Sequence, residues 1–240
     1  FVSNVIINNE GGSPSKKTLL GLGNDCTVFI SGFLENSDRL ALFSCCQKFY
    51  HFKRVLCYFK LNKEFSLKYL KDDDFRLLVR ESVNNPSDQL GLDFSNSYEI
   101  SGYKYNLAVL SNVHTLNLAG CINITDLSAL HGVHTLIACH CRNITKVNGL
   151  SGVTNLNLAW CGLITDVSGL GGVHTLDLTF CRFITDVSAL GRVHTLNLMA
   201  CDGITDVSAL GGVHTLNLRN CNKITDVRAL GGVHTLNLNG

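Results

Sequence analysis

The sequence predicts a solenoid, a coil of stacked turns with one short parallel strand per turn, behind a small helical N-terminal domain. A motif of 20 residues recurs from Val113 to the end of the 240-residue chain, and its apolar positions keep one spacing in every copy. Such a unit cannot bury its apolar edge alone, so the copies must stack. The helical spacing of apolar residues before residue 89 predicts the N-terminal domain.

The repeat has the consensus V-H-T-L-N-L-x-x-C-x-x-I-T-D-V-S-A-L-G-G. Six full copies begin at Val113, Val133, Val153, Val173, Val193 and Val213, and a partial seventh begins at Val233. Leu176 and Leu178 lie two residues apart, which is the spacing of inward side chains on a strand. The other apolar residues recur every three residues, which suits tight 3-10-like steps.

The pattern L-x-L-x-x-C resembles the signature of leucine-rich-repeat proteins, in a short class. The resemblance implies an α/β solenoid that coils right-handed, with a parallel sheet on its concave side. It also implies a non-catalytic protein-protein interaction module, so we expect no enzyme activity. We assign residues 1–18 to a polar arm, 19–88 to the helical domain, 89–112 to a degenerate first repeat and 113–240 to leucine-rich repeats.

One repeat position holds cysteine in every full copy. These residues are Cys121, Cys141, Cys161, Cys181, Cys201 and Cys221. In leucine-rich-repeat proteins this position points inward and bonds to the backbone of the adjoining turn, so we expect a buried ladder of reduced thiols. Metal binding and disulfides are the alternatives, but alternation places Cys139 outside and Cys141 inside, and no second ligand pair lies at zinc spacing. We therefore expect no cofactor and no metal, and an intracellular location.

The recurring histidines and Thr-Asp pairs are interpreted as structural. His114 and its equivalents recur in nearly every turn, and nothing singles out one copy as a catalytic triad. The Thr-Asp pairs, such as Thr185-Asp186, lie where side chains can satisfy backbone donors of a turn.

The copies differ mainly on both sides of the ladder cysteine, just after each strand. Because strands in adjoining turns lie about 4.8 Å apart, His140, Trp160 and Phe180 should stand in a row. This focus predicts a recognition edge on the concave side that binds another protein. The alternative is that the rings only pack on one another. The expected partner-binding residues are His140, Arg142, Trp160, Leu163, Phe180, Arg182, Phe183 and Met199.

Charge and hydropathy exclude two classes of partner. The formal net charge is +1, and residues 113–240 carry seven Lys or Arg against seven Asp, so we expect no nucleic-acid groove. No apolar run approaches the roughly 20 residues that span a bilayer, so we expect no membrane insertion. The last expected strand, His234 to Leu238, leaves a bare edge, where we expect either further repeats or an end-to-end contact.

The run VFISGFLENSDRLALFSCCQKFYHF, within residues 25–60, resembles an F-box. Helices are expected over Thr27 to Leu34, Ser37 to Tyr50 and Asp74 to Val83. The resemblance implies docking on the adaptor subunit of a cullin-type ubiquitin ligase; the alternative is a cap on the solenoid. The residues expected to dock are Phe29, Phe33, Leu34, Leu40, Leu42 and Phe49.

Two functions follow from these patterns. The first is an intracellular interaction protein, such as an F-box-type substrate receptor, whose concave edge holds a protein ligand. The second is a structural subunit of a larger assembly, because such repeat arrays behind F-box-like helices resemble proteins coded by giant DNA viruses; the protein would then lie in a virus particle.

Overall fold

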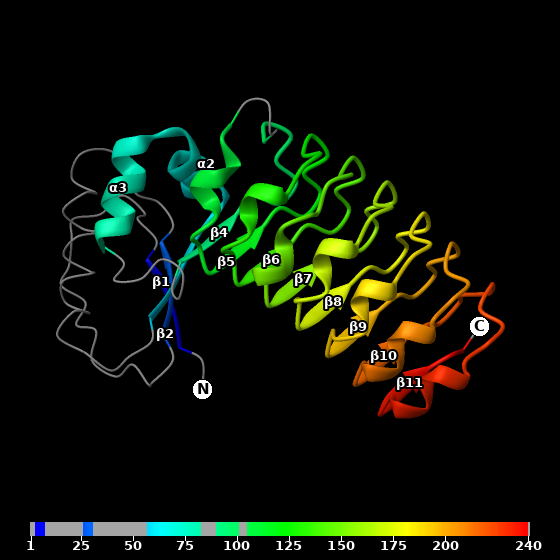
Figure 1. The fold of residues 1–240 in the computed structure, drawn as a ribbon. Helices are drawn as coiled ribbons and strands as arrows, with labels where there is room; N and C mark the ends of the chain where they lie inside the picture. The colour runs from blue at the N-terminus through cyan, green and yellow to red at the C-terminus, as the bar shows by residue number, and fades with distance from the viewer. Residues whose placement is uncertain (1–2, 8–25, 31–56, 83–89, 101–104, 240) are drawn as a thin grey trace. The chain divides into compact units, whose positions relative to one another are not determined.

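The computed structural model describes residues 3–7, 26–30, 57–82, 90–100 and 105–239 of the chain. The chain divides into two compact units, Phe1–Asp93 (unit 1) and Phe94–Gly240 (unit 2). Figure 1 shows the repeated turns of unit 2. Among the described residues, no helix is long and apolar enough to cross a membrane.

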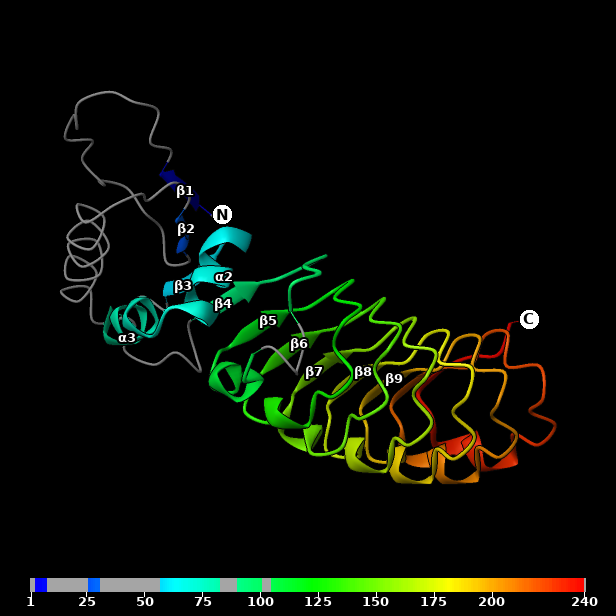
Figure 2. The same ribbon diagram turned by 90° about the horizontal axis from the view of Figure 1, so that it is seen from above.

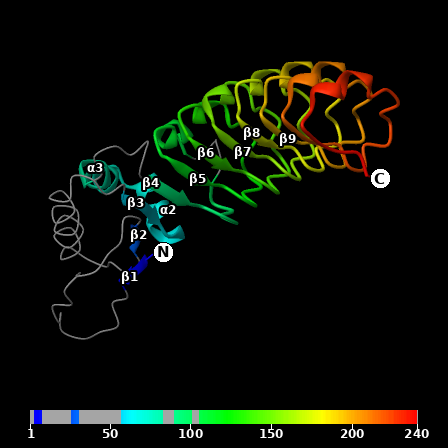
Figure 3. The same cartoon turned by 90° about the horizontal axis from the view of Figure 1, so that it is seen from below.

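Unit 2 is a coil in which each turn contributes a three-residue strand. The strands are β5 (Thr115–Asn117), β6 (Thr135–Ile137), β7 (Asn155–Asn157), β8 (Thr175–Asp177), β9 (Thr195–Asn197), β10 (Thr215–Asn217) and β11 (Thr235–Asn237). They pair in parallel in sequence order, and each residue lies opposite the residue 20 positions later, as Leu116 lies opposite Leu136. The strands line the inner side of the curve of this unit (Figure 3).

A short 3-10 helix lies on the outer side of each turn (Figures 2 and 3). These helices are η1 (Leu107–Leu110), η2 (Ser128–Leu130), η3 (Leu150–Gly152), η4 (Ser168–Leu170), η5 (Ser188–Leu190), η6 (Ser208–Gly212) and η7 (Arg228–Gly232). Their place in the repeat confirms the 3-10 steps predicted from the three-residue apolar spacing.

The core of unit 2 is a set of apolar columns that run through the turns. One copy contributes residues that are at most 2% exposed: Val173, Leu176, Leu178, Cys181, Ile184, Val187 and Leu190. Full burial of a leucine or isoleucine contributes roughly 1.5–3 kcal/mol, and such a turn cannot bury its apolar edge without its neighbours. Stacking therefore stabilises the coil, as the repeat predicts.

An aspartate begins the 3-10 segment of most turns. The Asp186 Oδ1 atom accepts the backbone N–H of Ser188 at 2.8 Å, and Asp126 and Asp166 do the same for Ser128 and Ser168. These bonds satisfy donors that the short helix leaves open. The Thr-Asp pairs thus have the predicted backbone role through their aspartates.

The turn that carries Lys146 is the exception. A lysine cannot accept a backbone N–H, and the 3-10 helix of this turn begins later, at Leu150. Gly149 precedes it with a φ of 89°, in the left-handed region where glycine is favoured. The Lys146 Nζ atom instead lies 3.9 Å from the Asp126 carboxylate of the preceding turn.

The first turn of unit 2 follows the repeat with altered residues. Phe94, Ile100, Leu107 and Leu110 are buried, like the columns of the later copies. Ser97 takes the position that cysteine holds in the next turns, and it is buried as well. The altered turn lies within the segment 89–112 that we assigned to a degenerate repeat, although residues up to Asp93 belong to unit 1.

Unit 1 combines parallel strands with two helices. The strands β1 (Ser3–Ile7), β2 (Cys26–Ile30), β3 (Cys57–Leu61) and β4 (Leu90–Asp93) pair in that order. The helices are α2 (Lys63–Lys71) and α3 (Asp73–Ser82). Side chains start both helices: Asn62 accepts the N–H of Phe65 at 3.0 Å and Asp72 accepts that of Phe75 at 2.9 Å.

Two expectations about unit 1 are wrong. Ser3–Ile7 is a paired strand within the segment expected to be a polar arm. Cys26–Ile30 is also a strand, where a helix was expected over Thr27 to Leu34. The four-residue spacing of Phe29 and Phe33 indicated a helix, but a short run of β-branched and aromatic residues suits a strand equally well.

The helix expected over Asp74 to Val83 is confirmed as α3, whereas α2 and β3 were not predicted. The helix expected over Ser37 to Tyr50 lies outside the described residues.

Candidate functional site

The ladder cysteines are structural groups in the core of unit 2. Each Sγ atom donates to a backbone carbonyl of the preceding turn, as Cys161 does to Ala138 at 3.1 Å and Cys201 to Leu178 at 3.2 Å. Burial raises the pKa of Cys161 and Cys201 to about 12, so these thiols stay protonated near neutral pH. All six are free and buried, as the repeat predicts.

The histidines form stacks at the start of the strands. The rings of His174, His194, His214 and His234 stack in sequence at centroid distances of 4.6–4.7 Å. The Nδ1 atom of His194 lies 3.2 Å from the hydroxyl of Thr195, and His214 repeats this contact. The histidine row is therefore a repeated structural contact, which fits the interpretation from the sequence.

The variable positions gather on one side of unit 2, which we call the strand-end edge. It comprises the two residues before and the two residues after each ladder cysteine. Its members are Ala119, Gly120, Ile122, Asn123, Cys139, His140, Arg142, Asn143, Ala159, Trp160, Gly162, Leu163, Thr179, Phe180, Arg182, Phe183, Met199, Ala200, Asp202, Gly203, Arg219, Asn220, Asn222 and Lys223.

The residue immediately before each ladder cysteine has a left-handed backbone. Its φ is 71° at Gly120, 60° at His140, 64° at Trp160, 61° at Phe180, 57° at Ala200 and 60° at Asn220. The backbone N–H of this residue bonds to the next turn, as Trp160 N–H donates to Thr179 and Phe180 N–H donates to Met199. Glycine and asparagine adopt it readily, but a bulky residue there costs on the order of 1–3 kcal/mol.

Three aromatic residues occupy this strained position in consecutive turns. The rings of His140 and Trp160 stack at 5.6 Å, and those of Trp160 and Phe180 stack at 4.0 Å. Trp160 nevertheless remains 43% exposed, and His140 is exposed too. The rings therefore pack on one another, as one of the two alternatives expects, and Trp160 and His140 still face solvent.

Apolar and basic residues flank this aromatic row. Leu163 is 45% exposed and Phe183 is 60% exposed. The Arg182 guanidinium lies 5.3 Å from the centre of the Phe180 ring and 3.8 Å from Asp202. Arg142 is exposed, and Met199 is half-buried. The structure thus brings all eight expected partner-binding residues to one edge.

The residues expected to dock an adaptor are not assembled into a described site. Phe29 lies in strand β2, and its side chain is outside the described part of the structure. Phe33, Leu34, Leu40, Leu42 and Phe49 also lie outside the described residues.

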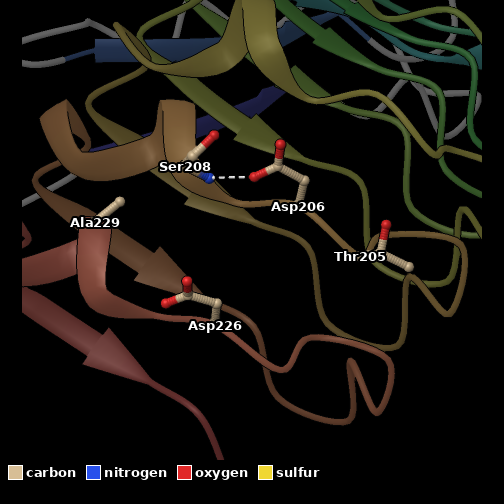
Figure 4. Close-up of a pocket in the computed structure, with 5 residues that line it drawn as sticks. All are labelled: Thr205, Asp206, Ser208, Asp226 and Ala229. Carbon is tan, nitrogen blue, oxygen red and sulfur yellow. Dashed lines mark hydrogen bonds between the residues drawn. The ribbon is translucent and has the colours of Figure 1, made fainter.

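A small hollow of about 210 Å³ lies between two turns that follow the aromatic row in the sequence (Figure 4). It is lined by Thr205, Asp206, Ser208, Asp226 and Ala229. Asp206 accepts the Ser208 N–H at 2.8 Å, and Asp226 pairs with Arg228 at 2.6 Å. Both carboxylates are thus engaged in structural contacts. Within the described part of the chain, no group of three His, Cys, Asp or Glu side chains is placed to hold a metal.

Sequence reasoning missed the left-handed conformation that the aromatic row adopts. The signal was present in Gly120 and Asn220, which hold the equivalent position in other copies and are the residue types that favour this conformation.

Comparison with solved structures returns two proteins of Listeria monocytogenes. Internalin C2 of Listeria monocytogenes is 23% identical, over 63% of this chain and 72% of that chain, with a TM-score of 0.45. The functional domain of InlJ from the same organism, which includes a cysteine ladder, is 16% identical over 62% of this chain, with a TM-score of 0.23. This chain spans 53% of that InlJ chain. No family model and no curated protein matches the sequence.

The fold itself is assigned from the chain's own strand pairing and repeat. Unit 2 is a leucine-rich-repeat solenoid with a parallel sheet on its concave side, and a small N-terminal part with two described helices precedes it.

Proposed function

We propose that unit 2 is a non-catalytic module that binds another protein through the strand-end edge, centred on Trp160 and Phe180. One observation carries this proposal. Three consecutive turns place an aromatic residue where the backbone favours glycine or asparagine, and the central ring is still 43% exposed. Strained conformations that persist are concentrated at functional sites.

The surroundings of the row support contact with a protein. Exposed Leu163 and Phe183 extend the apolar surface, and the Trp160 indole is the kind of side chain that dominates interface energetics. The stacking supplies a rigid surface, because each ring restricts its neighbours. Little conformational entropy would then be lost on binding.

Two more specific functions were expected from the sequence, an F-box-type receptor and a structural subunit of a virus particle. An F-box-type receptor requires a helix where Cys26–Ile30 forms a strand, so this alternative is not part of the proposal. A structural subunit of a virus particle stays a prediction. Its test is whether the protein is retained in purified particles after washes that remove surface-bound proteins.

The proposed function is tested by selecting peptides on the full chain and counter-selecting on a Trp160→Asn variant. A displayed library of random peptides of about twelve residues gives enough length to cross several turns. Asparagine suits the left-handed backbone, so the variant removes the ring while keeping the conformation. We expect clones that bind the wild-type chain and lose at least about tenfold in affinity for Trp160→Asn.

The matched control is Thr185→Asn, which introduces the same residue at an exposed position outside the strand-end edge. Selected clones should bind this variant as they bind the wild type. If no clone distinguishes Trp160→Asn from Thr185→Asn while both variants remain folded by circular dichroism, the edge is not a binding site and the proposed function is wrong.

A further inference from the structure

The charges of the repeats are segregated, although their sum is zero. Of the seven Lys or Arg residues after Val113, four lie on the strand-end edge, which carries a single Asp, Asp202. The edge therefore has a formal charge of +3, and the remaining three basic and six acidic residues leave −3 elsewhere on the repeats. The basic residues of the edge are Arg142, Arg182, Arg219 and Lys223.

These basic side chains are accessible. Arg142, Arg219 and Lys223 are exposed, and among the described residues none of the three lies within ion-pair distance of a carboxylate. Arg182 pairs with Asp202 at 3.8 Å, but the two side chains are 59% and 47% exposed. A pair so exposed is weak and is readily exchanged for another partner.

Most acidic residues outside the edge are held at the 3-10 segments; Asp177 is the exception, because its carboxylate accepts the N–H and the hydroxyl of Thr179 beside the aromatic row. Asp166, Asp186 and Asp206 each accept the N–H of the serine two residues later, at the start of the 3-10 segments. Hydrogen bonds from Ser188, the backbone N–H above all, lower the pKa of Asp186. This carboxylate remains ionised at neutral pH, so the separation of charge persists.

The exposed perimeter of the aromatic row, like the basic residues, attracts electronegative atoms of a ligand. Stacked rings cover much of each other's electron-rich faces, and Arg182 lies over Phe180. What remains available is largely the ring perimeter, which is electropositive in an aromatic ring. Such a perimeter favours carboxylate and carbonyl oxygens as well as apolar contact.

The spacing of these groups sets the size of the ligand. Arg142 and Lys223 lie four turns apart, which corresponds to about 19 Å at about 4.8 Å per turn. An extended chain advances about 3.3 Å per residue, so about six residues cover this distance. The apolar residues lie in the first half of the span and Arg219 and Lys223 at its end.

We propose that the ligand of the strand-end edge is an acidic, extended peptide segment of about six residues that crosses the turns along the solenoid axis. An apolar side chain of the peptide contacts Trp160 and Phe183. Its carboxylates pair with the basic residues of the edge, Arg142, Arg182, Arg219 and Lys223. This inference rests on the proposed function, because it specifies the partner of the same edge.

The peptide selection with Trp160→Asn as counter-target tests this inference separately from the function. Among clones that depend on Trp160, Asp and Glu should be at least about twofold more frequent than in the unselected library, because the edge is cationic. Trp160-dependent clones with Asp and Glu at or below the library frequency would overturn the inference and leave the proposed function intact. If no clone depends on Trp160, the proposed function and the inference about its ligand are both wrong.

A pair of double variants then locates the carboxylate contacts. Arg219→Gln with Lys223→Gln should weaken the selected peptides by about tenfold in isothermal titration calorimetry, and more at low salt than at high salt. Lys146→Gln with Arg192→Gln removes the same charge outside the edge and should leave the affinity unchanged. Equal weakening by the two double variants would mean that only net charge matters, and the inference would be wrong.

Discussion

Cys161 shows what the ladder position requires of a side chain. Its Sγ atom reaches the carbonyl of Ala138 at 3.1 Å, inside a core that excludes water. A buried carbonyl without a donor costs about 1–3 kcal/mol. A small side chain with a donor therefore suits this position. In the first turn of unit 2 Ser97 occupies the equivalent position, but its buried hydroxyl has no hydrogen-bond partner among the described residues.

We predict that Cys161→Ala lowers the free energy of unfolding by about 1–3 kcal/mol, because the carbonyl loses its donor and a small void is left. Cys161→Ser should lose less, because a hydroxyl can donate to the same carbonyl. Urea denaturation of the full chain measures both. Equal losses in the two variants would show that the thiol contributes through packing alone.

At the scale of elements, the strand and the turn differ in what the sequence reveals. Inward residues such as Leu176 and Leu178 follow from a spacing of two, and the 3-10 segments follow from a spacing of three. Both spacings are consequences of side-chain direction, so the order of residues alone reveals them. The short strand β2 could not be found in this way, because five residues fit either a helix or a strand and the partner strands decide.

The histidine row and the aspartate turns give unit 2 a defined response to acid. Desolvation, followed by repulsion from His174 and His214, lowers the pKa of His194 below its ordinary 6.5. The pKa of Asp186 is also lowered, from 3.8, by its hydrogen bonds to Ser188. In both cases the folded protein binds fewer protons than the unfolded chain, so stability is lost as the pH falls.

We predict two stages of acid destabilisation, one that begins as the pH drops below about 6.5 and one below about 3.8, which are the ordinary pKa values of histidine and aspartate. His194→Gln should reduce the first stage, as followed by the thermal midpoint between pH 7 and pH 5. His131→Gln changes an exposed histidine outside the stacks and serves as the control. If His194→Gln left the first stage unchanged, the histidine row would not be the cause of the acid destabilisation.

At the scale of the whole molecule, stability should be distributed turn by turn. Strand β8 pairs with β7 and β9, and residues such as Leu176 are buried by these neighbours. In solenoids the free energy is approximately a sum of repeat and nearest-neighbour contributions. A defect in one turn should therefore act locally.

We predict that Leu176→Ala destabilises unit 2 by about 2–5 kcal/mol and that the loss of amide protection is strongest in β7, β8 and β9. Hydrogen exchange read by mass spectrometry measures this profile. Leu176→Ile keeps the volume and should preserve protection. Uniform loss as far as β5 would instead show that the repeats unfold as one cooperative block.

The candidate site could be predicted in part. Variation around the ladder cysteines singled out eight residues, and all eight lie among the residues of the strand-end edge. The left-handed backbone under Trp160 could not be inferred from the pattern of apolar residues, because that pattern shows which side chains point inward and not the backbone angles of an exposed residue. The role of the edge in binding stays a prediction.

The constant register of 20 residues also bears on how this protein could change over generations. Recombination between near-identical copies in the coding DNA would delete or duplicate whole turns without disturbing the pairing of the remaining strands. Each such event would shift the aromatic residues relative to Arg219 and Lys223 by one step of about 4.8 Å. Whole turns can thus be inserted or removed, so the length of the ligand could change during evolution without a substitution in the core.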